Sequence, residues 1–138
     1  MIPNVLSFSL LTDGAAVDTI EEMKDVASRY PVNILMCTLT SRSQDFYMRV
    51  IREVIPMCEH LHTVTFESSD IGVEAIIELA KLLHTNTRLL HVTVPPTREK
   101  ERVDAAFAEA IRANRDRPPG IMWRIYCNDH DFERLAAL

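Results

Sequence analysis

The residues best suited to chemistry gather after the last apolar run of the chain, where Cys127, Asp129, His130 and Asp131 lie close together. Thiol, imidazole and carboxylate groups are metal ligands, and a histidine beside an aspartate can act as an acid/base pair. Four near-consecutive residues on a turn rarely converge on one ion, however, and no nucleophile or oxyanion-hole motif accompanies them. We interpret Asp129 or Asp131 as a helix N-cap, and we expect no catalytic residue and no metal site.

The three cysteines, Cys37, Cys58 and Cys127, are widely spaced and have apolar neighbours. A disulfide framework or a zinc site would need closer pairs, so we expect buried thiols in a reducing compartment and a cytoplasmic protein. The chain has only 3 glycines, which disfavours a phosphate-binding loop, and it lacks the common nucleotide-binding and hydrolase motifs. The sequence therefore predicts no cofactor.

Composition and charge narrow the class of protein. The 138 residues, 47% of them hydrophobic, can supply the core of one domain over 1–138, and the formal net charge is -5. An excess of acid argues against a nucleic-acid or anionic-membrane partner, which would select clustered basic residues. The apolar start of the chain has no basic region or cleavage site, and no stretch reaches the length of a membrane-spanning helix.

The chain repeats one pattern five times, which is apolar-x-x-apolar-x-apolar. The middle apolar residue falls at 6, 35, 64, 92 and 125, so the copies lie 29, 29, 28 and 33 residues apart. Regular spacing of this kind is typical of repeat architectures. We expect strands near 4–9, 32–38, 62–67, 90–95 and 122–127.

Stretches of helical period follow these segments. The stripe after the third strand is Ile76, Leu79, Ala80 and Leu83, and a similar one follows the fourth strand from Val103 to Ile111. We expect the first helix over about 13–29. The second helix is predicted with a capping box of Ser41 and Gln44 and an end or kink at Pro56.

Strands that alternate with helices predict a parallel sheet. Thr63 and Thr65 alternate with Val64 and Phe66, so only one face of the third strand is apolar, whereas strands covered on both faces are apolar throughout. We therefore predict an α/β fold, a short right-handed βα solenoid of about five parallel strands with helices on one face. A doubly wound sheet is the alternative.

The run from Leu82 to Val94, with its Asn86-Thr87-Arg88-Leu89 phrase, resembles leucine-rich repeats of the ribonuclease-inhibitor type, and it is also similar to the C-terminal repeat domain of the tropomodulin family. Ala110 to Asn114 repeats the phrase, although the position that is Asn or Cys in the family is Thr, Ser, Leu or His here. The resemblance implies a leucine-rich-repeat-like fold and protein binding on the concave face of the sheet, but it does not identify the partner.

The outward strand positions form the predicted binding surface. Met, Tyr and Arg are enriched in interface cores, and exposed apolar neighbours favour cover by a partner. The predicted partner-binding residues are Ile34, Met36, Thr38, Thr63, Thr65, Glu67, His91, Thr93, Arg124 and Tyr126.

We therefore predict a non-enzymatic scaffold or interaction module with a protein partner and with neither nucleic acid nor membrane as a ligand. One alternative is a small enzyme or ligand-binding domain with its site at the strand C-termini, near Thr40, Ser69, Thr97 and His130. The other is a structural unit that forms a homodimer through exposed sheet edges.

Overall fold

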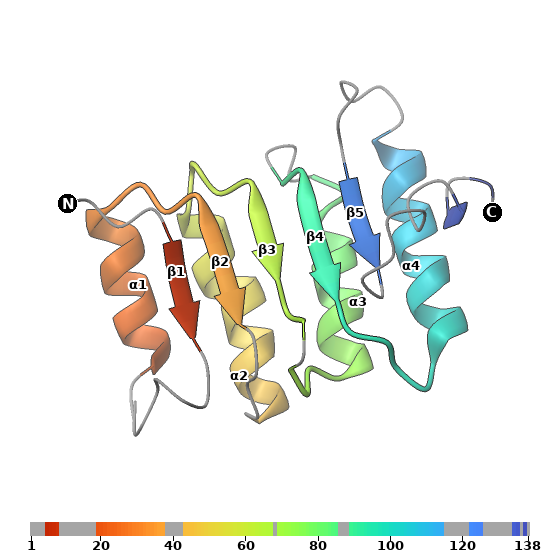
Figure 1. Ribbon diagram of the computed structural model, residues 1–138, viewed down its shortest axis with the longest axis horizontal. Coiled ribbons are helices and arrows are strands. Elements are labelled where there is room, and N and C mark those ends of the chain that lie inside the picture. Colours follow the sequence, from red (N-terminus) through yellow and green to blue (C-terminus); the bar gives the residue numbers. More distant parts are fainter. Residues whose placement is uncertain are drawn as a thin grey trace.

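A computed structural model describes residues 5–8, 19–37, 43–67, 69–85, 89–114, 122–125, 134, 135 and 137, and for 5–8, 19 and 122–125 it describes the backbone alone. Strands alternate with helical segments along the chain (Figure 1). The elements are β1 (Val5–Phe8), α1 (Thr19–Arg29), β2 (Ile34–Cys37), α2 (Gln44–Arg49), η1 (Val50–Val54), η2 (Ile55–Met57), β3 (Thr63–Thr65), α3 (Val73–Leu82), β4 (His91–Val94), α4 (Lys100–Ala113) and β5 (Met122–Ile125).

The strands pair in chain order, β1-β2-β3-β4-β5, and every pairing is parallel. A connection that crosses over the sheet and returns in the same direction is needed between parallel strands, and helices supply it here. Figure 1 shows the strands in front of α2, α3 and α4. We call the side turned to the viewer the outer face of the sheet.

The predicted core is confirmed wherever its side chains are described. Leu35, Val64 and Val92 on the strands are fully buried, and so are Phe66, directly after β3, and Phe107 on α4. They join the inward residues of the helices in one cluster, which contains Ile20, Met23, Ile76, Leu79, Ala80, Leu83, Val103, Ala110 and Ile111. The predicted core residue Ile125 has no described side chain.

The fold class predicted from the sequence is corrected. Only three parallel strands, β2, β3 and β4, are described with their side chains, together with four α-helices. The helical units are not alike, because α1, α3 and α4 have 11, 10 and 14 residues, whereas α2 has 6 and continues directly into η1 and η2. The structure supports a small α/β fold, and the prediction of a right-handed solenoid of about five strands, leucine-rich-repeat-like, is withdrawn.

The last copy of the sequence pattern was aligned incorrectly. The spacing of 33 residues placed Ile125 opposite Val92, whereas in the sheet Trp123 lies opposite Val92 and Ile125 lies opposite Val94. The shift is two residues. The shift moves Arg124 from the position opposite His91 to the position opposite Thr93.

The second helix departs most from the prediction. Its N-cap is Ser43, whose Oγ accepts a hydrogen bond from the backbone N of Phe46 at 3.2 Å, and Ser41 lies outside the described residues. The helix then widens into the π-helix η1 and ends in the 3-10 turn η2, which contains Pro56. The predicted break at Pro56 is therefore confirmed. Its physical reason is that proline has no N–H to donate the hydrogen bond that continues a helix.

Candidate functional site

Six predicted surface residues lie side by side on the outer face. The parallel register places Ile34 opposite Thr63 and Thr63 opposite His91; two residues further along, Met36, Thr65 and Thr93 form a second row. All six are half-buried. Neighbouring strands lie about 4.8 Å apart, so the six side chains form one continuous patch, which we call the outer patch.

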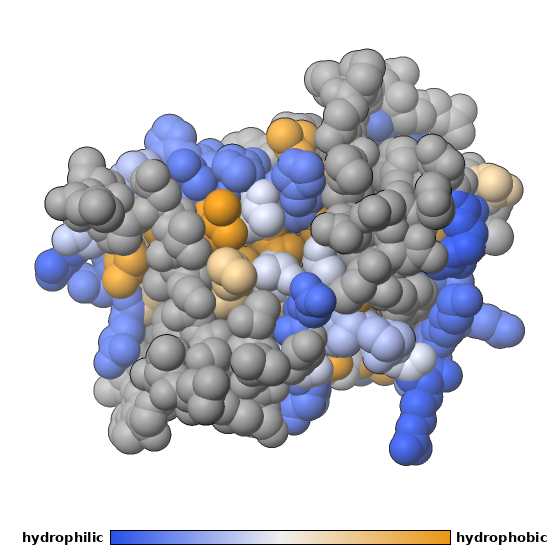
Figure 2. All heavy atoms as spheres, in the orientation of Figure 1, coloured by the Kyte–Doolittle hydropathy of each residue, from blue (hydrophilic) through white to orange (hydrophobic). Residues whose placement is uncertain are grey.

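The outer patch is apolar at one side and polar at the other. Ile34 and Met36 come from β2, while β3 and β4 supply threonines and one histidine. Figure 2 shows orange and tan surface beside pale and blue surface over the middle of this face. A partner could therefore bury apolar groups against β2 and form hydrogen bonds with β3 and β4.

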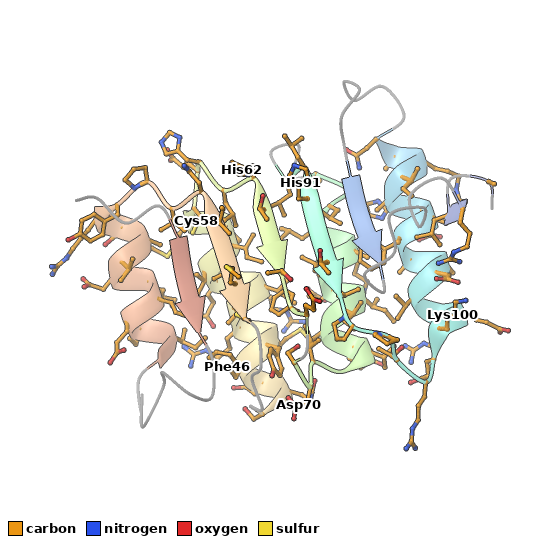
Figure 3. All side chains as sticks on the ribbon, viewed as in Figure 1. Phe46, Cys58, His62, Asp70, His91 and Lys100 are labelled. Atoms are coloured by element: carbon orange, nitrogen blue, oxygen red, sulfur yellow. The ribbon has the colours of Figure 1, made fainter. Side chains whose placement is uncertain are left out.

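Two of the patch hydroxyls already have partners at the ends of β3. Thr63 Oγ1 lies 2.7 Å from His62 Nδ1, and Thr65 Oγ1 accepts from the backbone N of Glu67 at 3.3 Å. A hydroxyl can both donate and accept, so each keeps hydrogen-bonding capacity for a ligand. Figure 3 shows His62 and His91 at the edge of the sheet where the strands begin.

Several predicted residues are not tested. Thr38 and Tyr126 lie outside the described residues, as do Thr40 and the cluster of Cys127, Asp129, His130 and Asp131. For Arg124 the register is known and the side chain is not described. Glu67 is exposed just beyond β3.

The edge where the strands end is held by long-range hydrogen bonds that the sequence analysis did not predict. Gln44 Nε2 donates to the carbonyl O of Asp70 at 2.8 Å, and Gln44 Oε1 accepts from the backbone N of Gly72. The buried Tyr47 donates its hydroxyl to Asp70 Oδ1 at 2.8 Å. These pairs are more than 20 residues apart in the chain, so no local spacing could have indicated them. Figure 3 labels Asp70 and Phe46 at this edge.

Two residues with hydroxyl groups, which follow β3 and β4, differ in their hydrogen bonding. Ser69 Oγ donates to the carbonyl O of Phe66 at 2.7 Å and accepts a hydrogen bond from the backbone N of Ile71 at 3.4 Å, so this hydroxyl satisfies backbone groups of the turn after β3. Thr97 Oγ1 is buried and has no hydrogen-bond partner. Both residues line a hollow of about 330 Å³ between the start of α3 and the segment after β4.

The helical layer carries an ion-pair network with a structural role. Glu53 on η1 pairs with Lys24 on α1 and with Arg49, whose Nε lies 2.8 Å from Glu53 Oε2. Hydrogen bonds from Arg49 and then Lys24 lower the pKa of Glu53 from 4.5 to about 2. The network joins two neighbouring helical segments on the side away from the outer patch.

The described residues show few features of a catalytic or metal-binding site. Burial raises the pKa of the Cys37 thiol to about 12, so the thiolate needed of a nucleophile does not form near neutral pH. Within the described ranges, no three His, Cys, Asp or Glu side chains are grouped to hold a metal ion. None of the described helices is both long and apolar enough to cross a membrane.

Comparison with known proteins gave no match to a protein-family model, a curated protein or a solved structure. The predicted fold of that family is withdrawn above, so the resemblance to leucine-rich repeats stays a prediction about family membership alone, and the function is argued from the chain itself.

Proposed function

We propose that this protein is a non-enzymatic interaction module that binds a protein partner on the outer face of its sheet. The observation that carries the proposal is the pair Ile34 and Met36. Both apolar side chains stay half-buried on the outer face, beside their register partners Thr63 and Thr65 on β3. Removing about 100 Å² of apolar surface from water is worth about 2.5 kcal/mol. An adjacent apolar pair therefore provides a real driving force for association.

The mixture of groups favours a protein over a small apolar ligand. Interface cores combine apolar contacts with hydrogen bonds at their margin, and the threonines and His91 supply these next to Met36. The proposed contact residues are Ile34, Met36, Thr38, Thr63, Thr65, Glu67, His91, Thr93, Arg124 and Tyr126. We place the protein in the cytoplasm because Cys37 is a buried free thiol, which suits a reducing compartment.

A photo-crosslinking amino acid placed at Thr65 tests the location directly. We expect ultraviolet light to link it to a discrete partner band in cell extract, and we expect the double variant Ile34→Ser/Met36→Ser to lose that band. The matched control is Leu90→Ser, because Leu90 is also an exposed apolar side chain, 37% exposed, but lies directly before β4 and outside the outer patch. Loss of the band in Leu90→Ser, with the double variant unaffected, would refute binding on the outer face.

A second candidate function is supported by the hollow at the strand C-termini. Its 330 Å³ volume and the unpartnered hydroxyl of Thr97 suit a small polar ligand, and ligands of parallel sheets bind at this edge. A thermal-shift screen of small metabolites, repeated on Thr97→Val, separates the two functions. Stabilisation that disappears in Thr97→Val would favour the ligand-binding domain.

A further inference from the structure

A second hollow, of about 410 Å³, lies where α1 ends and the segments leading to β2 and β3 begin. Residues 27–32 and 57–60 line it, and Figure 1 shows the end of α1 at the same edge of the molecule as the starts of these strands. Tyr30 and Met57, both 38% exposed, are two of the three large hydrophobic side chains that are exposed in the described chain. Both side chains line this hollow, so it offers exposed apolar surface to a ligand.

The end of α1 leaves two backbone carbonyls in this hollow without an intrahelical donor. Pro31 has no N–H to give to the carbonyl of Ala27. The N–H of Val32, which would reach Ser28, donates to the carbonyl O of Tyr30 at 2.9 Å instead. Carbonyls at a helix C-terminus carry partial negative charge, so this end of α1 attracts donors and cations.

The side-chain charges in the hollow agree with that preference. Glu59 is exposed, and it takes part in no ion pair within the described residues. The one arginine of the hollow, Arg29, is occupied by Asp25, with Nε 3.2 Å from Oδ1. Of the two basic side chains in the lining, Arg29 pairs with Asp25 and His60 is exposed, so Glu59 and the carbonyls of α1 stay available to a cationic ligand.

We propose that this hollow binds an arginine side chain of a partner protein. A guanidinium ion stacks on an aromatic face such as that of Tyr30 and donates several hydrogen bonds in one plane. The carbonyls of Ala27 and Ser28 and the carboxylate of Glu59 are acceptors for these donors, and Met57 offers apolar surface to the aliphatic stem. An ammonium ion lacks the plane and the fork, so lysine fits less well. The proposal stands whether or not the outer patch binds a partner.

The test titrates the ¹⁵N-labelled protein with the blocked tripeptide Gly-Arg-Gly and follows backbone amide shifts by NMR. We expect saturable shifts confined to the amides of 27–30, 32 and 57–60, with a dissociation constant in the millimolar range as suits so small a probe. The citrulline tripeptide has the same shape without the charge, and it should give no saturable shift. The proposal would be overturned if the amide shifts appear only elsewhere, if they do not saturate, or if the citrulline tripeptide binds equally well. If the lysine tripeptide binds as tightly as the arginine tripeptide, the choice of arginine would be overturned.

Variants identify the groups responsible. Tyr30→Leu and Glu59→Gln should each weaken the arginine peptide about two- to fivefold, because exposed cation–π contacts and ion pairs are worth about 0.5–1 kcal/mol. Tyr30→Phe keeps the ring and should restore binding. The controls are Glu67→Gln, an exposed acid elsewhere, and Met36→Ser on the outer patch. Unchanged affinity in both Tyr30→Leu and Glu59→Gln, or a loss in Met36→Ser, would overturn the assignment to this hollow.

Discussion

Replacing Phe66 with alanine tests the packing that defines both faces of the sheet. The ring is fully buried, and it meets Tyr47 edge-on, with ring centroids 6.2 Å apart and an interplanar angle of 79°. The backbone bonds of Phe66 survive the substitution, since they join its N to the carbonyl O of Thr93 and its carbonyl O to the N of Ser69. The variant therefore loses side-chain packing and little else.

The expected loss in free energy of unfolding is about 4 kcal/mol. Truncation of a buried phenylalanine costs about 3–5 kcal/mol through lost transfer energy and the cavity left behind. The edge-on contact with Tyr47 accounts for about 0.5–1.5 kcal/mol of ring-pair energy, which argues against the bottom of that range. For a chain of this size the melting temperature should fall by about 12–16 °C.

Urea unfolding followed by circular dichroism measures this loss, and Thr65→Ala is the matched control on the neighbouring residue. Thr65 faces the outer side and is half-buried, and its hydroxyl accepts one hydrogen bond from the backbone N of Glu67, so its truncation should cost about 1 kcal/mol. A loss below about 1 kcal/mol for Phe66→Ala would refute the inward register of β3. Equal losses for the two variants would refute the one-sided packing as well.

Three further outcomes follow from single groups. The lowered pKa of Glu53 means that its ion pairs stabilise the fold fully above pH 4.5 and lose effect as the pH falls toward 2. Between these pH values the urea midpoint of the wild type should therefore approach that of Glu53→Gln. A difference between the two midpoints that does not change with pH would contradict the role of these ion pairs. Tyr47→Phe removes the hydroxyl that bonds Asp70 and should cost about 1 kcal/mol in thermal unfolding, whereas no change would mean that water replaces the bond without loss. Cys37, with its pKa raised to about 12 by burial, should escape iodoacetamide in the folded protein at pH 8 and react after unfolding; peptide mapping by mass spectrometry checks this, and labelling at the rate of an exposed thiol would disprove the burial.

Local periodicity predicted the strands and the inward face of the helices because both depend on neighbouring residues in the chain. The alternation of Val64 and Phe66 with threonines matches their burial, and the stripe from Ile76 to Leu83 is the buried side of α3. The alignment of β5 failed because the pattern recurs every two residues along a strand, so an apolar match at Ile125 fits either of two registers. Long-range hydrogen bonds decide between them, and the sequence does not display these.

The candidate sites were predictable only where they lie on strands. Alternation alone was enough to place Met36 and Thr65 on one surface. The hollow beside Tyr30 brings together segments about 30 residues apart, and its orphan carbonyls arise from Pro31, which the sequence analysis did not use. A proline directly after a helix was the available signal, since it removes the donor that the preceding turn needs.

The two proposed surfaces are close enough for one partner to use both. Val32 lines the hollow and Ile34 belongs to the outer patch, and two residues of extended chain span about 7 Å. An extended partner segment presents alternate side chains on one side at that same interval, so an arginine and a following apolar residue match the hollow and β2 in turn. Each contact alone is weak, but once the arginine is bound the apolar side chain is held near Ile34 at high effective concentration. We therefore expect a segment that carries both side chains to bind more tightly than either contact alone.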